Sequence, residues 1–427
     1  MPEASPLHSW RRSLLGTLAL VVLVGAIAAT AVLATRGAPA ASPTPVPSSP
    51  SSEPARTAAA APTPTPEPIT TTCPSETAPP PASDIPAHRA VNFGVEDLVD
   101  ERPGHLEALA ERLDQVGANT VSISVGRLDW IEFPWAGNER NQSSDVIKTG
   151  RDYVGEAVNV FRCAPDGTSR TVILGIDTLF GRDIQRGTVP AGQTVGGWSS
   201  DLFASLSAWK SDELSSRLIA LAEELAVRYQ PDAINITELF FDTTVYGPAD
   251  LVDFRSVSGM NDWPRRDDGG VDAHHPAVTA WKTDALTGVL AQLDQVLTPH
   301  GVELTADVRG PLDVHTPTRA DIGQDYPRML EHADRLNVWD FPGVNQWIGV
   351  LDANDYASVL FGPAPERYSL EIGLWLGGGA ISPDVLRKEL AVASDFGIRS
   401  VSVTPASLMT DAHWNVLQQE WREKATP

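Results

Sequence analysis

The residues of this chain with the clearest capacity for chemistry are carboxylates that follow short apolar segments. The best example is Glu238, which comes directly after the isoleucine-rich segment 233–237 and just before Phe240 and Phe241. The segment is short, apolar and preceded by Pro231, a pattern that predicts a buried strand. In a parallel barrel, a carboxylate at the C-terminal end of a strand points into the mouth, where catalytic groups lie. An isolated glutamate more often caps a loop or pairs with an arginine. A catalytic role for Glu238 therefore becomes more credible only if the same arrangement recurs along the chain.

The arrangement does recur. Other carboxylates end predicted strands or lie near their ends: Glu96, Asp177, Asp307, Asp340 and, slightly inside its strand, Glu371. Cleavage of a glycosidic bond needs two carboxyl groups, one protonated and one ionised, and crowding carboxylates together separates their pKa values. We therefore expect Glu238 to be the proton donor and Asp307, Asp340 or Glu371 to be the second catalytic carboxylate.

Aromatic and basic residues accompany these carboxylates, and the chain contains 12 tryptophans. Sugar rings have flat apolar faces and polar edges, so aromatic rings beside carboxylates and arginines suit a sugar site. The predicted substrate-binding residues are Glu96, Arg127, Trp130, Asp177, Tyr246, Arg309, Trp339 and Trp375. Arg127 and Arg309 would hold a sugar carboxylate or a pair of hydroxyls. Simpler roles also exist, since Arg309 could pair with Asp307 and Trp339 could pack inside the barrel.

Strand-like and helix-like segments alternate from about residue 88 onward, which indicates an α/β fold with a parallel sheet. Eight strands are predicted, at residues 90–95, 120–125, 170–176, 233–237, 302–306, 336–339, 368–374 and 400–403. Eight strands with intervening helices predict a (β/α)8 TIM barrel. The alternative is a doubly wound open sheet, which would normally carry a glycine-rich phosphate loop after its first strand. Segment 93–97, Phe-Gly-Val-Glu-Asp, is not such a loop.

With Glu238 closing the fourth strand and Glu371 on the seventh, residues 87–421 resemble the retaining TIM-barrel glycoside hydrolases. The pattern is most similar to uncharacterised glycosyl-hydrolase-like barrels of exported bacterial proteins. The resemblance implies that Glu238 is the acid/base and Glu371 the nucleophile. The sequence departs from that group at Thr237, where an asparagine usually precedes the glutamate.

The N-terminal part of the chain has a different composition. Residues 13–35 form an uncharged apolar run, preceded by Arg11 and Arg12, and are long enough to span a bilayer. We expect residues 1–12 to be cytoplasmic and 13–35 to be a single-pass signal anchor, by the positive-inside rule. A cleaved signal peptide, which would release a secreted protein, and a twin-arginine export signal are the alternatives. All three put the barrel, residues 87–427, outside the cytoplasm.

Residues 36–86 are rich in proline, alanine, serine and threonine and predict a disordered linker. Cys73 lies near its end, and Cys163, the other cysteine of the chain, lies in the barrel. An oxidising compartment would allow a Cys73–Cys163 disulfide that ties the linker to the barrel.

The composition also excludes several classes of function. The net charge of -23 argues against nucleic-acid binding, which needs basic patches. His274 and His275 lack a third ligand at a recognisable spacing, and no Gly-x-Ser-x-Gly nucleophile motif is present, so we expect neither a metal nor a cofactor. The expected partners are a polysaccharide or oligosaccharide and the membrane. The alternative to an enzyme is a non-catalytic carbohydrate-binding barrel at the cell surface.

Overall fold

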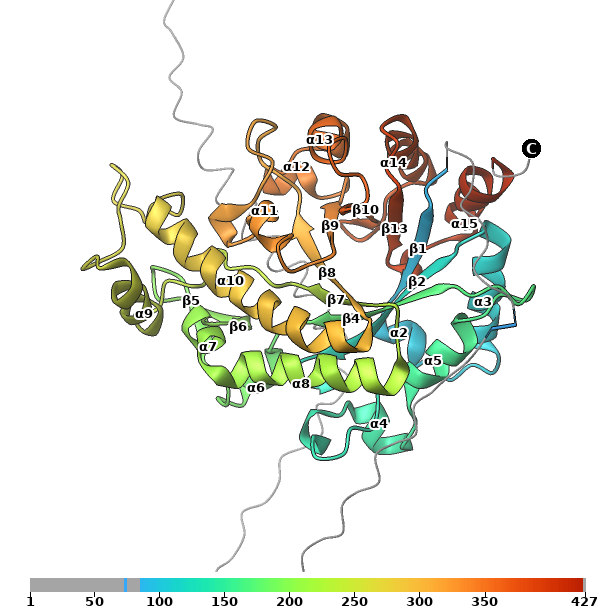
Figure 1. The fold of residues 1–427 in the computed structure, drawn as a ribbon, viewed down its shortest axis with the longest axis horizontal. Coiled ribbons are helices and arrows are strands. Elements are labelled where there is room, and N and C mark those ends of the chain that lie inside the picture. Colours follow the sequence, from blue (N-terminus) through green and yellow to red (C-terminus); the bar gives the residue numbers. More distant parts are fainter. Residues whose placement is uncertain (1–72, 75–84, 425–427) are drawn as a thin grey trace, which may run out of the picture. The chain divides into compact units, whose positions relative to one another are not determined.

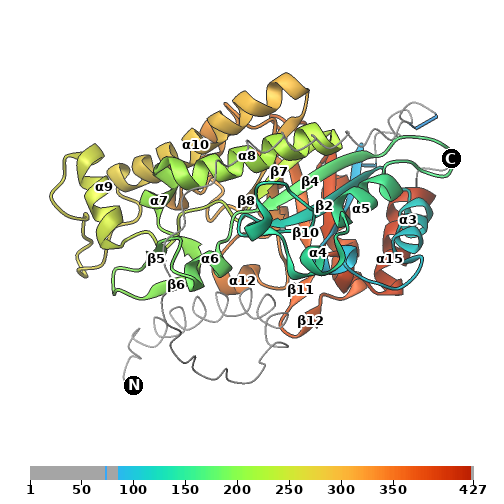
Figure 2. The ribbon, with the colours of Figure 1, turned by 90° about the horizontal axis from the view of Figure 1, so that it is seen from below.

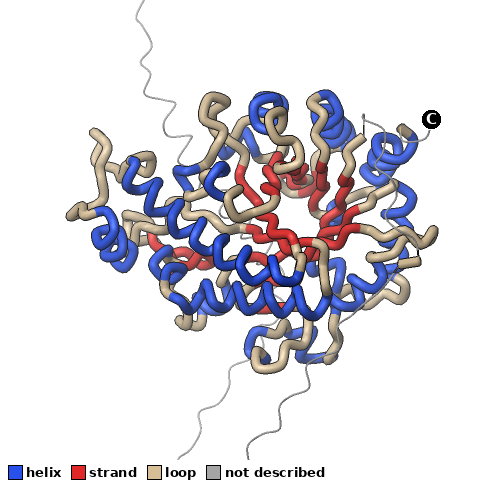
Figure 3. Tube along the Cα trace, viewed as in Figure 1, coloured by secondary structure: helices blue, strands red, loops and turns tan. Residues whose placement is uncertain are grey.

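The computed structural model describes residues 73–74 and 85–424. Within them, eight parallel strands form a closed barrel, which appears as a ring of strands surrounded by helices (Figures 1 and 3). In order around the barrel the strands are β1 (His88–Phe93), β2 (Thr120–Arg127), β4 (Thr171–Asp177), β7 (Ala233–Thr237), β8 (Glu303–Arg309), β9 (Arg335–Asp340), β10 (Tyr368–Gly373) and β13 (Ser400–Thr404). Because β1 pairs with both β2 and β13, the sheet has no open edge. The TIM-barrel prediction is confirmed, and the doubly wound sheet is excluded.

Helices cover the outside of this barrel (Figure 3). The longer ones are α3 (His105–Val116), α5 (Tyr153–Phe161), α8 (Asp212–Tyr229), α9 (Pro248–Ser258), α10 (Pro276–Leu297), α13 (Ala353–Leu360), α14 (Pro383–Asp395) and α15 (Asp411–Leu417). The shorter ones are α2 (Val95–Leu98), α4 (Ser144–Thr149), α6 (Gly181–Gln185), α7 (Leu206–Lys210), α11 (Tyr326–Met329) and α12 (Asn345–Ile348). One short strand and two hairpins lie outside the eight barrel strands: β3 (Trp130–Ile131), β5–β6 (Ala191–Gln193, Ser199–Ala204) and β11–β12 (Trp375–Leu376, Gly379–Ala380).

The strands alternate apolar and polar side chains because successive residues point to opposite faces of a sheet. In β4 the apolar set, Val172, Leu174 and Ile176, is fully buried and belongs to the hydrophobic core with the helices. On β7 to β9, the side chains that point into the barrel hydrogen-bond to one another across neighbouring strands, as Asn235 does with Thr305. A TIM-barrel interior is usually filled by Val, Ile and Leu. Here the inward face is largely polar, and the core lies between the barrel and its helices.

The segment that follows β3 forms two separate helices, α4 and α5. Gly150 ends α4 in the left-handed conformation (φ 70°), which glycine adopts without steric cost. Asp152 then starts α5, and its side chain accepts a hydrogen bond from the Gly155 amide (2.7 Å).

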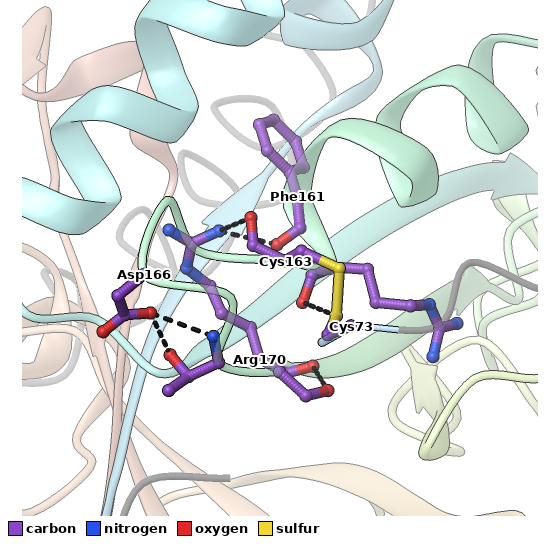
Figure 4. The surroundings of a disulfide bond; sticks show 8 residues. Cys73, Phe161, Cys163, Asp166 and Arg170 are labelled. Carbon is purple, nitrogen blue, oxygen red and sulfur yellow. Dashed lines mark hydrogen bonds between the residues drawn. A yellow bond between two sulfur atoms is a disulfide. The ribbon is translucent and has the colours of Figure 1, made fainter. Parts of the chain in front are cut away.

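The predicted disulfide is present and joins Cys73 to Cys163, across 90 residues of sequence. Cys163 lies two residues after α5, in a turn held by Arg170, whose guanidinium donates to the carbonyls of Phe161 (2.8 Å) and Cys163 (3.2 Å) (Figure 4). Arg170 is almost fully buried and pairs with Asp114 of α3. The disulfide is therefore attached to an internally braced part of the barrel.

The predicted signal anchor, residues 13–35, lies outside the described residues, as does most of the predicted linker. No helix in the part of the chain that the structure describes is long and apolar enough to cross a membrane.

Candidate active site

Glu238 lies one residue beyond the end of β7 and has a positive φ of 62°. This left-handed conformation is uncommon for residues other than glycine and costs about 1–2 kcal/mol. Such strain persists only where the surroundings enforce it, and it occurs often at functional sites. The backbone therefore turns sharply at this position, and the Glu238 side chain is half-buried rather than free in solvent.

Two carboxylates and two arginines act electrostatically on Glu238; we call these five residues the mouth cluster: Arg127, Asp177, Glu238, Asp307 and Arg309. Burial raises the pKa of Glu238 to about 7, the negative charge of Asp177 adds to this rise, and the charges of Arg309 and Arg127 oppose it. A pKa near 7 allows a carboxyl group to remain largely protonated in mildly acidic to neutral solution. Glu238 thus has the property required of a general acid.

Both arginines of the mouth cluster are occupied by ion pairs. The Arg127 Nε donates to Asp177 Oδ2 (2.9 Å), and an Arg309 terminal nitrogen lies 3.5 Å from Asp242 Oδ2. The Asp177 Oδ1 also accepts from the Leu179 amide (2.8 Å), so its charge is held in place. Each arginine thus already has a carboxylate partner, and their predicted role in holding a sugar carboxylate or a pair of hydroxyls stays a prediction.

Asp307 lies within β8, buried in the barrel interior. Its Oδ1 accepts from the side-chain amides of Asn235 (2.9 Å) and Asn337 (3.0 Å). The Asn235 Oδ1 in turn accepts from Asn337 (2.9 Å) and from the Thr305 hydroxyl (2.9 Å), which fixes both amides. Burial raises the pKa of Asp307, while these amide donors favour its charged form. Asp307 is therefore held in one orientation by three neighbouring strands, β7, β8 and β9.

Glu371 lies within β10, also inside the barrel, and is 6 % exposed. Burial and the negative charge of Asp307 raise its pKa well above the ordinary value, and hydrogen bonding with Ser402 and Asn92 opposes the rise. Such a side chain holds its proton over a wide pH range. Glu371 differs in this respect from Asp307, whose Oδ1 accepts two amide hydrogen bonds that favour the charged form.

Asp340 does not lie at the mouth, and this prediction was wrong. The strand continues to Asp340, so Trp339 faces the barrel interior and Asp340 faces the helices. Its Oδ1 accepts from Asn345 of α12 (2.9 Å), and burial together with the nearby Glu389 of α14 raises its pKa. Asp340 therefore belongs to a buried carboxyl pair on the outside of the barrel.

The other predicted binding residues have different positions. Trp130 is half-buried on β3, with the Arg127 guanidinium 5.8 Å from its ring centroid. Glu96 is exposed on α2 and accepts from the Ser407 hydroxyl (2.7 Å). Tyr246, which was predicted to bind substrate, is instead buried edge-on against Trp263 (5.1 Å), and its hydroxyl accepts from Lys282.

Three half-buried aromatic residues form what we call the aromatic platform: Trp339, Phe341 and Trp375. The rings of Trp339 and Phe341 stack with centroids 5.0 Å apart, and Phe341 lies 5.1 Å from Trp375. Trp375 begins the β11–β12 hairpin. Figure 2 shows this hairpin and the β5–β6 hairpin along the same lower edge of the barrel, with α12 between them.

Phe203 of the β5–β6 hairpin contacts Phe240 (5.2 Å), which follows Glu238 closely in sequence. Aromatic side chains therefore flank the mouth cluster on the β4–β7 side and on the β9–β10 side.

The sequence did not single out several residues of the site. These are Phe203, Asn235, Asp242, Gln324 and Asn337. Asn235 and Asn337 had a detectable signal, since each is a polar residue inside an apolar strand. Among the described residues, no group of three or more histidine, cysteine or acidic side chains could hold a metal. His275 instead caps α10, where its Nδ1 accepts from the Ala277 amide (3.2 Å).

No model of a known protein family matches the sequence, and no curated protein matches it. Solved structures with the same fold include the PgaB (BpsB) glycoside hydrolase domain from Bordetella bronchiseptica, which is 15% identical with a TM-score of 0.57 over 78% of this chain and 98% of that one. The catalytic domain of β-amylase from Paenibacillus polymyxa is 13% identical, with a TM-score of 0.54 over 80% of this chain and 99% of that one. A β-galactosidase from Marinomonas ef1 is 12% identical, with a TM-score of 0.54 over 78% of this chain and 58% of that one. These likenesses establish the fold, a closed barrel of eight parallel strands.

Proposed function

We propose that this protein is a glycoside hydrolase that cleaves a polysaccharide at the barrel mouth. The observation that carries the proposal is the pKa of Glu238, raised to about 7 beside the carboxylates Asp177 and Asp307. Burial also raises the pKa of Asp307, but the amides of Asn235 and Asn337 favour its charged form, which suits Asp307 as the charged partner of a protonated Glu238. The solved structures of similar fold are named as enzymes that act on glycosides, which agrees with this chemistry.

In the proposed reaction, Glu238 donates its proton to the oxygen of the leaving sugar. Asp307 is the charged partner, which either attacks the sugar or activates a water molecule. The amides of Asn235 and Asn337 hold Asp307 in the orientation that this role needs. Burial keeps Glu238 protonated, the negative charge of Asp177 adds to this effect, and Arg127 holds Asp177 in place.

We propose further that the sugar unit at the point of cleavage carries no carboxylate. In this proposal Asp307 is ionised, while Arg127 and Arg309 are paired with Asp177 and Asp242. An anionic sugar would therefore meet the negative charge of Asp307 and find no unpaired guanidinium. Trp339, Phe341 and Trp375 would stack on the apolar faces of neighbouring sugar units.

We also propose that the barrel acts outside the cytoplasm, tethered by residues 13–35. The Cys73–Cys163 disulfide supports an oxidising compartment, because disulfides rarely persist in a reducing cytosol. Protease treatment of intact cells should remove the barrel while leaving a cytoplasmic control protein intact. Protection of the barrel from the protease would contradict this location.

The test of the enzymatic proposal is reducing-sugar release from a panel of neutral polysaccharides by the full-length protein. Glu238→Gln and Asp307→Asn should each reduce release by about 10²-fold or more, as expected for loss of a catalytic carboxyl group. Asp340→Asn is the matched control, since Asp340 is a buried carboxyl group that faces the helices, and it should retain activity. Absence of release from every polymer, with sugar binding retained, would instead favour a non-catalytic carbohydrate-binding barrel.

A further inference from the structure

We propose that Gln324 is a positioning residue that fixes the separation between Glu238 and Asp307. This inference rests on the proposed function for its catalytic meaning. Gln324 lies in the loop between β8 and α11 and is 1 % exposed. Its side chain hydrogen-bonds to backbone atoms and to no carboxyl group of the mouth cluster, so we expect its effect on the reaction to pass through the backbone that it holds.

The side-chain amide of Gln324 makes three hydrogen bonds to the ends of two strands. Its Nε2 donates to the Leu239 carbonyl (3.1 Å) and to the Asp307 carbonyl (3.1 Å). Its Oε1 accepts from the Arg309 amide (3.0 Å). Leu239 is the residue directly after Glu238. One side chain therefore joins the backbone next to the proposed acid to the backbone of its proposed charged partner.

The Gln324 backbone is itself held by hydrogen bonds, so its side-chain amide has a fixed position. We call this amide, with its three hydrogen bonds to the ends of β7 and β8, the bracket. Its amide donates to the Arg319 carbonyl (3.0 Å), and its carbonyl accepts from the Arg319 amide (2.9 Å). Arg319 is buried and forms a bidentate ion pair with Asp321. The loop after β8 thus presents the amide group at a defined distance from the β7 and β8 ends.

The strained backbone of Glu238 explains why such a bracket is needed. Its φ of 62° persists only if the residues on both sides are restrained. On the N-terminal side, the Thr237 carbonyl accepts from the amide (3.2 Å) and hydroxyl (3.0 Å) of Thr178. On the C-terminal side, Gln324 holds the Leu239 carbonyl. The Phe241 amide also donates to the Ile322 carbonyl (2.7 Å) on this side, but only the Gln324 bond holds the residue next to Glu238, so loss of the Gln324 amide would let Glu238 relax.

Few side chains could replace Gln324. The bracket needs two N–H donors and one acceptor on a single planar group, which a primary amide supplies. An ionised carboxylate only accepts hydrogen bonds, so it would repel the Leu239 and Asp307 carbonyls. Methionine matches the length of glutamine without the amide, and asparagine keeps the amide but is shorter by one methylene. The methionine variant therefore removes the hydrogen bonds but keeps the length of the side chain, while the asparagine variant keeps the amide but shortens the side chain.

The experiment compares Gln324→Met and Gln324→Asn with the parent and with Gln292→Ala. Gln292 is the matched control, an exposed glutamine whose amide donates only to the Gly288 carbonyl of its own helix, α10. The first readout is the pKa of Glu238, followed by carboxyl ¹³C NMR and assigned with Glu238→Gln. The second is the division of the kinetic effect between kcat and KM on the neutral polysaccharide that the parent cleaves.

Both Gln324 variants should bring the pKa of Glu238 closer to its ordinary carboxyl value, because the relaxed side chain becomes more exposed to water. We expect kcat to fall by about 10-fold to 10²-fold, the cost of a small misplacement of catalytic groups, with KM nearly unchanged. Gln292→Ala should match the parent in both readouts. A folded variant with lower Tm but parental pKa and kcat would overturn the proposal and make Gln324 merely structural.

The NMR readout separates this inference from the proposed function. If the parent cleaves no polysaccharide but the Gln324 variants still shift the pKa of Glu238, the enzymatic proposal fails while the bracket is upheld. If the parent is active and the pKa does not move, the bracket fails while the enzymatic proposal is upheld.

Discussion

The guanidinium carbon of Arg309 lies 4.1 Å from the centre of the Phe240 ring. Arg309 is also paired with Asp242, so its charge is held by a ring on one side and a carboxylate on the other. Phe240 and Asp242 both belong to the loop that follows Glu238, while Arg309 ends β8. The charge that opposes the high pKa of Glu238 is therefore positioned by the same loop that contains Glu238.

The first prediction concerns pH. Because Glu238 must be protonated to act and its pKa is about 7, kcat/KM should fall as the pH rises through about 7. Asp177→Asn removes a negative charge that raises this pKa. The fall of kcat/KM at alkaline pH, the alkaline limb of the pH profile, should therefore move to lower pH. Asp284→Asn, which removes an exposed carboxylate paired with Arg328, is the control and should leave the limb in place. An unchanged limb in Asp177→Asn would mean that another group controls the profile.

The second prediction concerns the charge of the ligand. Asp242→Asn removes the carboxylate that neutralises Arg309, which should create an unpaired guanidinium at the mouth. Oligogalacturonate should then inhibit the variant competitively while leaving the parent unaffected. Asp253→Asn removes the partner of Lys210 instead and should behave like the parent. Inhibition of the parent itself would contradict the proposal of an uncharged sugar unit.

The third prediction concerns the aromatic platform. Trp375→Ala should raise KM by about fivefold, corresponding to about 1 kcal/mol of lost ring stacking, with little change in kcat. Phe396→Ala is the control, since Phe396 is an exposed aromatic residue that precedes β13 and so lies at the opposite end of the barrel. Steady-state kinetics on the cleaved polysaccharide measures both. A parental KM in Trp375→Ala would exclude the platform from binding.

The fourth prediction concerns stability and the buried pair of Asp340 and Glu389. The pKa of Asp340 is higher in the folded protein than in the unfolded chain, so its contribution to stability is fully present below its ordinary pKa. That contribution is lost as the pH rises toward the folded-state pKa. Asp340→Asn cannot ionise and keeps an oxygen for the Asn345 amide.

We expect Asp340→Asn to gain at least about 1 kcal/mol relative to the parent as the pH rises from about 4 to about 8, or about 1–2 °C in Tm for a domain of this size. Thermal unfolding across that range measures the difference. Asp284→Asn again serves as the control, and its Tm should differ from that of the parent by the same amount at every pH. A Tm difference independent of pH would show that Asp340 does not titrate differently on folding.

The barrel and part of the site were predictable because closure brings strand ends together. Asp177, Glu238 and Asp307 were recognised from their place at the ends of apolar segments, and a parallel barrel gathers such ends at one mouth. The same logic failed for Asp340, since a shift of one residue in a strand moves a side chain to the other face. Tyr246 lies in a loop, where no periodicity distinguishes a buried ring from an exposed one.

Gln324 shows a further limit of the sequence. Nothing in its neighbours along the chain distinguishes it from an ordinary polar loop residue. Its importance comes from contacts with Leu239, 85 residues away, and Asp307, 17 residues away. Asn235 and Asn337 were easier to recognise in principle, because polar residues at alternate positions of an apolar strand indicate a polar interior.

The Cys73–Cys163 disulfide also determines how the barrel would bear mechanical load. A pull on the chain upstream of Cys73 enters the barrel through the sulfur bridge and passes to the turn after α5, which Arg170 braces. The disulfide bypasses the backbone between Cys73 and His88, where β1 begins, so that part of the backbone carries little of the tension. A barrel tethered by its N-terminal segment would therefore resist peeling of its first strand under shear, for as long as the bridge stays oxidised.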